Sequence, residues 1–160
     1  MAVPHEVDGV GAVGPMCDNC GSTQALAHNL EPGWRLEEIQ DVLTERFSLC
    51  TTETKLLMGF CVSLSRDVLN EVGLLDEDLF LGNDDLELSW RLQTHGLKLL
   101  VAKDVFVHHV DHVSFKTVEP GAIHNFIVES SQALSSKLIA YYDGHPPSDQ
   151  DLWGLSFRHV

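Results

Sequence analysis

Three acidic side chains stand close together in the segment LGNDDLELSWRL: Asp84, Asp85 and Glu87. The apolar spacing that follows predicts a helix that begins at about Asp84, with Asn83 as its N-cap. The first turn of a helix exposes unpaired N–H groups and the positive end of the helix dipole, which favours ionised carboxylates. An ionised carboxylate can accept a proton as a general base, or face a metal ion or a ligand hydroxyl. Acidic residues placed there for the dipole alone would give the same pattern, so both interpretations are open.

A group of histidines follows in VFVHHVDHVSF, where His108, His109 and His112 lie close in sequence with Asp111 among them. In a strand, His108 and His109 would point to opposite faces, so only one of the two could reach a shared site. Histidine nitrogens and carboxylate oxygens are common metal ligands. A histidine near the end of a strand is also often a hydrogen-bonded structural residue. A metal site and a structural role are therefore both open.

Strand-like and helix-like segments are mixed along the chain, which predicts an α/β fold. Gly73 stands where a left-handed helix cap belongs, and Gly96 where the acidic helix should stop. The expected strands are 9–16, 55–65 and two β-like runs within 97–110 that are broken near Lys103 and Asp104. The expected helices are 35–49, 66–73, 84–95 and 121–142, followed by an irregular tail from residue 144. The apolar stripe of the last helix is Ile123, Ile127, Leu134, Leu138 and Tyr141.

The chain of 160 residues is acidic, with 24 acidic and 10 basic residues and a formal charge of -14. This balance argues against a nucleic-acid binder, which needs a basic face for phosphates, and against binding to anionic membrane surfaces. No run approaches the ~20 apolar residues of a membrane span. The N-terminus also lacks the basic start and apolar core of a signal peptide. We therefore expect no membrane span and a cytoplasmic location.

Four cysteines are present, and two of them, Cys17 and Cys20, form a C-x-x-C pair. Such a pair can hold zinc or act in redox chemistry. A zinc ribbon needs a second close pair, and Cys50 and Cys61 are too far apart to supply it. The spacing therefore favours ordinary reduced thiols over structural zinc or a redox pair.

The stretch from LLMGFCVSLSRDVLNEVGLLDEDLF through DDLELSWRLQTHGLKL to VFVHHVDHVSF resembles the C-terminal part of the catalytic domain of family 2 glycosyltransferases, which have the GT-A fold. The first piece is similar to the family's strand, helix and Gly-x-x-Asp-Glu loop. The second is similar to its acidic helix and the glycine turn after it. The third is similar to its closing strand, with a histidine five residues before a serine. The upstream GAVGPMCDNCGSTQ and the tail KLIAYYDGHPPSDQDLWG also resemble family segments, in the same order.

The resemblance implies inverting transfer of a sugar from a nucleotide-sugar donor to a glycan or lipid-linked acceptor. Asp85 matches the general base that deprotonates the acceptor hydroxyl, and Asp84 stands beside it where the family usually has glutamate. His109 matches a histidine that, in some members, helps to hold the Mg²⁺ or Mn²⁺ bound to the donor diphosphate. Glu87 matches the second acid of the motif. The positions expected to bind substrate are Gly59, Phe60, Cys61, Asp76, Glu77, Trp90 and Arg91.

In this family a nucleotide-binding half and an Asp-x-Asp metal motif precede the strand that corresponds to residues 9–16. Asp76-Glu77-Asp78 has the right letters but lies in a loop after a helix, which is the wrong place. The expected architecture is thus a partial GT-A fold, a mixed sheet with flanking helices whose nucleotide-binding half is missing. Residues 1–118 would form the second half of the catalytic domain, and 119–160 a C-terminal helix and tail.

A chain of this kind should be inactive alone, because it would lack the diphosphate site. It should also be poorly stable or oligomeric, or depend on a partner for the missing half, because its sheet would expose an edge and apolar faces. An alternative function is a non-catalytic acidic metal-binding module that uses the His109 region and Cys17 and Cys20. A truncated reading frame with no function of its own is a third possibility.

Overall fold

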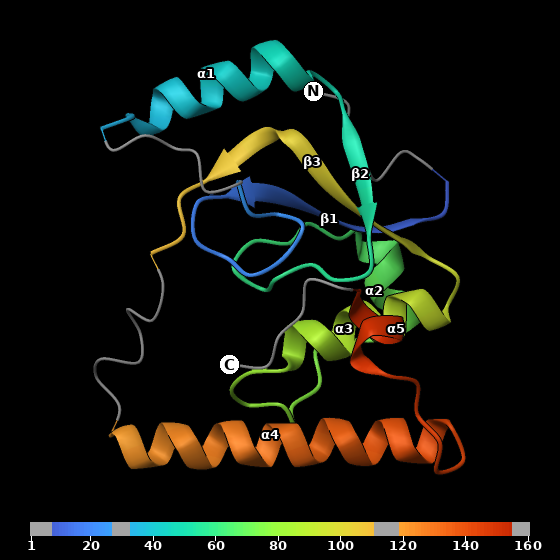
Figure 1. The fold of residues 1–160 in the computed structure, drawn as a ribbon. Coiled ribbons are helices and arrows are strands. Elements are labelled where there is room, and N and C mark those ends of the chain that lie inside the picture. The colour runs from blue at the N-terminus through green and yellow to red at the C-terminus, as the bar shows by residue number, and fades with distance from the viewer. Residues whose placement is uncertain (1–7, 27–32, 111–118, 155–160) are drawn as a thin grey trace.

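The computed structural model describes residues 8–26, 33–110 and 119–154 and shows an α/β fold with a three-stranded mixed sheet and five helices (Figure 1). The α/β class predicted from the sequence is confirmed. His112, Asp111 and the expected serine after them lie outside the described residues. The elements in chain order are β1 (Val10–Cys17), α1 (Leu36–Phe47), β2 (Thr51–Thr54), α2 (Arg66–Val72), α3 (Asp84–Thr94), β3 (Lys98–Val107), α4 (Pro120–Tyr141) and α5 (Asp149–Trp153).

The strand order is β1-β3-β2, with β1 parallel and β2 antiparallel to β3. Strand β1 is almost wholly buried although it stands at one end of this order. Its outer edge is partly covered, because Val13 exchanges two backbone hydrogen bonds of 3.0 and 2.8 Å with Ser63. At Val13 the outer edge of β1 is therefore not left without hydrogen-bond partners, contrary to the expectation. Strand β2 at the other end is exposed except for Thr54, which is half-buried.

The predicted strand over 55–65 is wrong. This segment is a loop whose β-like contact is the bridge of Ser63 to Val13, and the strand that pairs with β3 lies just before it at Thr51–Thr54. Leu56 and Leu57 are buried, so the apolar run was a true signal of burial but not of a strand. The sequence TTET gave no apolar alternation because this strand is an exposed one.

The two β-like runs expected within 97–110 form one strand, β3, with an irregular register. Pro15 of β1 is opposite Ala102, whereas the next residue, Met16, is opposite Phe106. The predicted break near Lys103 and Asp104 therefore corresponds to a bulge within a continuous strand. Side-chain atoms of Gln40 in α1 occupy it, since Gln40 Nε2 donates to the Asp104 carbonyl (2.7 Å) and Oε1 accepts from Phe106 N–H (2.8 Å).

The helices form layers on the sheet. Helix α1 covers one face, α2 and α3 lie on the opposite side, the long α4 runs beyond α3, and the short α5 packs against α3 (Figure 1). The core accordingly falls into clusters. The first joins the sheet to α2 and α3 and includes Ala12, Leu57, Val68, Leu92, Leu99 and Val101; the second joins α3, α4 and α5 and includes Leu86, Trp90, Leu134, Leu138, Leu152 and Trp153; the third joins Val10 and Val13 to Ala102.

Helix α4 was predicted with nearly its observed bounds, but its apolar stripe is only partly used. Leu134 and Leu138 are buried, whereas Ile127 and Tyr141 are 42% and 55% exposed. The tail expected to be irregular contains the short helix α5, and Ser148 is its N-cap, whose side chain accepts the Asp151 N–H. Trp153 of this helix is buried and donates from Nε1 to the Leu86 carbonyl at 2.9 Å, so the tail is fixed against α3.

Candidate functional site

The loop before Gly59 is held by side chains rather than by a strand partner. Leu57 N–H donates to Ser89 Oγ (3.2 Å), Met58 N–H to Gln24 Oε1 (2.7 Å) and Gly59 N–H to Asp85 Oδ2 (3.2 Å). Three consecutive amide groups thus find acceptors outside a sheet, which explains how a buried segment can remain a loop. The arrangement fixes Gly59 against the start of α3.

Helix α3 begins where the sequence predicts, but not by the predicted cap. Asn83 is in the N-cap position with a left-handed backbone (φ 65°), and its side chain makes no cap hydrogen bond. Its Nδ2 instead donates to Ser131 Oγ of α4 at 2.9 Å. The first turn carries Asp84, Asp85 and Glu87, as expected. Of these, Asp85 accepts the Gly59 N–H and also the N–H of Leu86, at 2.9 Å from its Oδ1.

The electrostatics of Asp85 differ from the expectation. Burial raises the pKa of the Asp85 carboxyl above its ordinary value, and the neighbouring charge of Asp84 raises it further. Hydrogen bonds from Gly59 N–H and Leu86 N–H lower the pKa, but they do not cancel the effect of burial. The N–H groups of the helix start do favour the ionised form of Asp85, as predicted, but burial and the charge of Asp84 outweigh them, which the sequence did not show. A carboxylate with a raised pKa is the better proton acceptor, which is what a general base requires.

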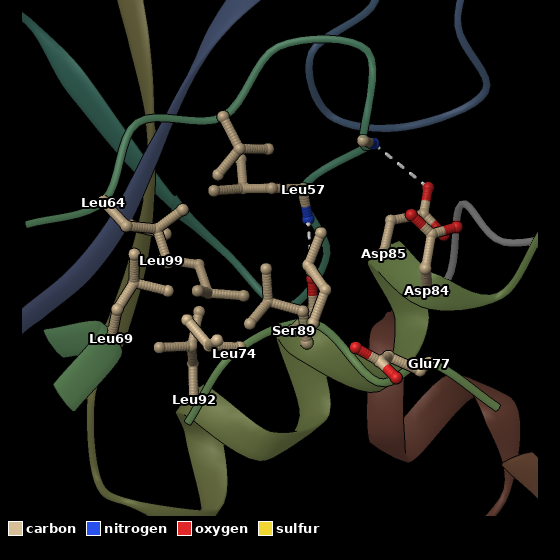
Figure 2. A pocket seen from close by; sticks show the side chains of 15 residues that line it. Leu57, Leu64, Leu69, Leu74, Glu77, Asp84, Asp85, Ser89, Leu92 and Leu99 are labelled. Atoms are coloured by element: carbon tan, nitrogen blue, oxygen red, sulfur yellow. Dashed lines mark hydrogen bonds between the residues drawn. The ribbon is translucent and has the colours of Figure 1, made fainter. Parts of the chain in front are cut away.

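A cavity of about 550 Å³ opens beside this helix start. Figure 2 shows two different ends: leucines gather on one side, and the carboxylates of Glu77, Asp84 and Asp85 stand on the other. Gly59 also lines it, and a β-carbon added there would lie 3.4 Å from Asp85 Cβ. The leucines labelled in the wall are Leu57, Leu64, Leu69, Leu74, Leu92 and Leu99.

Two of the residues expected in the site, Glu87 and Arg91, belong to an internal ion pair. Glu87 is 2% exposed, and Arg91 Nη2 lies 3.0 Å from its Oε2. Arg91 also donates to the carbonyls of Val72 (2.6 Å) and Leu74 (2.9 Å) at the end of α2. The positive φ of Gly73 lets the chain turn between these two carbonyls, although its ψ of 170° is not that of the predicted left-handed cap. Arg91 therefore fastens α3 to α2.

The loop after α2 contributes Leu74, Leu75 and Glu77 to the lining. Glu77 is exposed and lines the cavity, as expected for a residue on the substrate side. Asp76 instead pairs with Lys137 of α4, whose Nζ also lies 3.3 Å from Glu87 Oε1. Trp90 is buried in the second cluster and donates from Nε1 to Tyr142 Oη at 3.2 Å. Asp76, Trp90 and Arg91 are not among the residues that line the cavity.

The histidine region lies next to the Gly59 loop through an aromatic contact. Phe60 stacks on His109 with ring centroids 4.9 Å apart, although Phe60 itself does not line the cavity. His109 Nδ1 lies 2.7 Å from the Asn19 carbonyl, and the backbone N–H of His109 donates to Asp18 Oδ1 at 3.0 Å. His108 Nδ1 contacts the other carboxylate oxygen of Asp18 at 2.5 Å. The structure thus brings the two regions predicted to be functional together, with Gly59 and Phe60 between them.

Cys17 and Cys20 form a disulfide that encloses Asp18 and Asn19. The expectation of reduced thiols at this pair is wrong, and the alternative metal module loses two of its proposed ligands. Cys61 is exposed and, like Cys50, is a free thiol. Among residues 8–26, 33–110 and 119–154, no group of three or more His, Cys, Asp or Glu side chains could hold a metal ion. The described side chains therefore do not fit a complete Mg²⁺ or Mn²⁺ site.

Several residues that shape the site were not singled out from the sequence. Gln24 is fully buried and donates from Nε2 to the Pro15 carbonyl (3.0 Å) while its Oε1 holds Met58 N–H. Ser89 is likewise buried and lines the cavity. One sequence signal existed for Ser89, a small polar residue on the apolar face of a helix. Gln24 had none, since it lies in a polar loop far from the segments that it joins.

Comparisons with protein-family models, with curated proteins and with solved structures found no match to this chain. In the part of the chain that the structure describes, no helix has both the length and the apolar character needed to cross a membrane.

Proposed function

We propose that this chain takes part in inverting sugar transfer as the acceptor side of a GT-A catalytic domain, with Asp85 as the general base. The motif order of residues 56–115 suggested this function, and one structural observation supports it best. Asp85 lines a cavity at the start of α3, in surroundings that raise the pKa of its carboxyl. A cavity of about 550 Å³ has the size of an ordinary small-molecule site, roughly 300–1,000 Å³.

The proposed step needs one carboxylate. An acceptor hydroxyl oxygen attacks the anomeric carbon of the donor sugar, and its proton passes to Asp85. The bond between that carbon and the diphosphate oxygen breaks at the same time, and the nucleoside diphosphate leaves with the electron pair. Both Asp85 oxygens already accept a backbone N–H, which orients the carboxylate, and each retains a second lone pair for the hydroxyl. The neighbouring Asp84 helps to keep the proton on Asp85 after transfer, since it raises that pKa.

The other residues have supporting positions in this proposal. The Gly59 N–H holds its loop against Asp85, and Glu77 lines the same cavity from the loop after α2. His109 is held beside this loop by its stacking on Phe60. The described residues supply no donor set that favours the alternative of a metal-binding module. A cytoplasmic location remains part of the proposal, although a disulfide such as Cys17–Cys20 is uncommon there.

The test is sugar transfer by the longest natural polypeptide that contains this sequence. It would be incubated with UDP-, GDP- and dTDP-sugars, a panel of alcohol and glycan acceptors, and Mn²⁺ or Mg²⁺. Mass spectrometry would detect the glycoside, and a coupled assay would detect the nucleoside diphosphate. We expect a product of inverted anomeric configuration. Asp85→Asn should lower kcat by about 100-fold or more, the usual contribution of a general base.

Asp67→Asn is the matched control, because Asp67 is also an aspartate in the first turn of a helix but is exposed and does not line the cavity. Its turnover should stay within about twofold of the wild type. The proposal fails if no nucleotide sugar in the panel gives a product. The assignment of Asp85 fails if Asp85→Asn keeps turnover within a few-fold.

A further inference from the structure

The cavity beside α3 is poorly suited to hold a sugar ring in its depth. A buried sugar hydroxyl needs a hydrogen-bonding partner, because burying one without a partner is unfavourable. The leucines of the wall offer none. The carboxylates of Glu77, Asp84 and Asp85 stand at one end, as Figure 2 shows. Ser89 also lines the cavity, but its Oγ already accepts the Leu57 N–H at 3.2 Å. Apart from this hydroxyl the cavity has an apolar body and one polar end, so its shape and polarity fit an amphiphile better than a polyol.

The opening of the cavity is also apolar, which is a second feature typical of a binding site. Leu74 and Leu75 both line it, and they are 69% and 56% exposed. Arg91 holds the Leu74 carbonyl at 2.9 Å, so this apolar rim is fixed in place at the end of α2. Exposed leucines that continue into an apolar cavity are typical of a binding site, whereas single exposed leucines elsewhere need no explanation.

We propose that this cavity binds an uncharged amphiphilic alcohol, whose alkyl or aryl body lies among the leucines and whose hydroxyl reaches the end formed by Asp84 and Asp85. The inference rests on the proposed function and deepens it, since it gives the class of acceptor. An anionic head group is excluded, because the three carboxylates at that end and the formal chain charge of -14 would repel it. Fatty acids and phosphorylated lipids are therefore not the ligands.

The first experiment measures binding to the purified chain by NMR titration, without any donor. The probes are octan-1-ol, octanoate, which has a similar apolar body and an anionic head, and glycerol, which has hydroxyls and no apolar body. We expect saturable shifts of the Leu57, Gly59 and Ser89 amides with octan-1-ol. Octanoate should bind at least about tenfold more weakly because of charge repulsion. In a series of shorter alcohols, each added CH2 should tighten binding by up to about fourfold until the cavity is full.

The second experiment fills the cavity. Leu64→Phe adds a ring to the wall and should weaken binding of octan-1-ol by about tenfold or more. Leu100→Phe is the matched control, because Leu100 is half-buried like Leu64 but packs against the third core cluster and does not line the cavity. It should bind as the wild type does. If Leu64→Phe fails to fold, Leu69→Phe in α2 fills the same cavity from another element.

Equal binding of octan-1-ol and octanoate would overturn the inference, as would binding that Leu64→Phe and Leu69→Phe leave unchanged. Tighter binding of glycerol than of octan-1-ol would do the same. The two proposals fail in distinguishable ways. Binding of octan-1-ol without sugar transfer to any acceptor contradicts the proposed function and keeps the alcohol site. Transfer to polar acceptors by a chain that does not bind octan-1-ol contradicts only the inference.

Discussion

Two partly buried aspartates, Asp18 and Asp85, lie in neighbouring regions of the molecule, and their pKa values are shifted in opposite directions. Burial alone raises the pKa of Asp18, but the His109 N–H and the His108 ring outweigh it, so the net pKa is lowered. Burial also raises the pKa of Asp85, and here the charge of Asp84 adds to it, so the net pKa is raised in spite of the backbone N–H donors.

The number of hydrogen-bond donors does not set the direction of the pKa shift, because each aspartate accepts backbone N–H groups. The groups next to each carboxylate set the direction of its pKa shift. Asp18 has an imidazole as its neighbour, whereas Asp85 has another carboxylate and an apolar cavity. Two carboxylates whose environments separate their pKa values are suited to different tasks. Asp18 is suited to remain an anion that fixes the histidines, and Asp85 to take up a proton.

A third carboxylate, Glu87, extends the comparison and gives the largest expected effect. It lies in the same helix as Asp85 but is 2% exposed and paired with Arg91. Arg91→Met should lower the free energy of unfolding by about 3–5 kcal/mol, because it leaves a buried charge without its main partner. It also removes the two hydrogen bonds to the end of α2. Urea denaturation followed by circular dichroism would measure the change.

The control for Arg91→Met is Arg46→Met at the exposed end of α1, which should change stability by less than about 0.5 kcal/mol. Similar costs for the two variants would contradict the structural role given to Arg91. The resemblance placed Arg91 on the substrate side. A variant that stays stable but loses substrate binding would restore that earlier assignment.

The second prediction concerns Asp18 and is smaller. Asp18→Ala removes the acceptor of the His109 N–H and of the His108 ring and should cost about 1–2 kcal/mol near neutral pH. Asp41→Ala, an exposed position in α1, is the control and should stay within about 0.5 kcal/mol. Because the folded pKa of Asp18 is lowered, its contribution is present above the ordinary value of 3.8 and is lost as pH falls through the folded pKa.

The dependence of stability on pH separates the two aspartates. Asp85 has a raised folded pKa, so its contribution is fully present below 3.8 and is lost as pH rises through the folded value. Asp18→Ala should therefore flatten the acid limb of the wild-type stability profile. Asp85→Asn should instead remove a loss of stability that begins above 3.8. Urea midpoints measured across this pH range would check both signs, and the same change of profile in both variants would contradict the comparison.

The sequence predicted one of these regions well and the other poorly, for physical reasons. The bounds of α3 and the place of its acids followed from apolar spacing and from helix-start preferences, which are local properties. The sign of the Asp85 shift did not follow, because it depends on a cavity built from leucines of several elements. Likewise, no local signal showed that Leu56 and Leu57 would be buried as a loop. Their segment is fixed by Gln24 and Ser89, which are distant in sequence.

The Asp18 region depended still more on long-range contacts. The C-x-x-C spacing of Cys17 and Cys20 allowed zinc, redox chemistry or free thiols, and the spacing alone did not select the disulfide. The histidines were visible in the sequence, but their partner Asp18 lies 90 residues before His108. The sequence therefore indicated His109 as a candidate, but it did not show that the ring nitrogen of His109 faces the Asn19 carbonyl.

The smallest predicted effect comes from a variant that separates two causes of the raised Asp85 pKa, the charge of Asp84 and burial. Asp84→Asn removes the like charge and leaves the cavity unchanged, so it should lower the pKa of Asp85. The pKa would be measured by NMR titration of the Asp85 carboxyl carbon. In the transfer assay the acid limb of the rate profile should move to lower pH, because the base then loses its proton at lower pH.

Glu77→Gln is the matched control for Asp84→Asn, since Glu77 lines the same cavity but is not among the causes of the Asp85 shift. It should leave the pKa of Asp85 unchanged. If Asp84→Asn leaves this pKa unchanged as well, burial alone would account for the shift, and the difference between Asp85 and Asp18 would reduce to the absence of an imidazole. If Asp84→Asn raises the pKa, the two carboxylates would have to share a proton, and neither could be named as the base on its own.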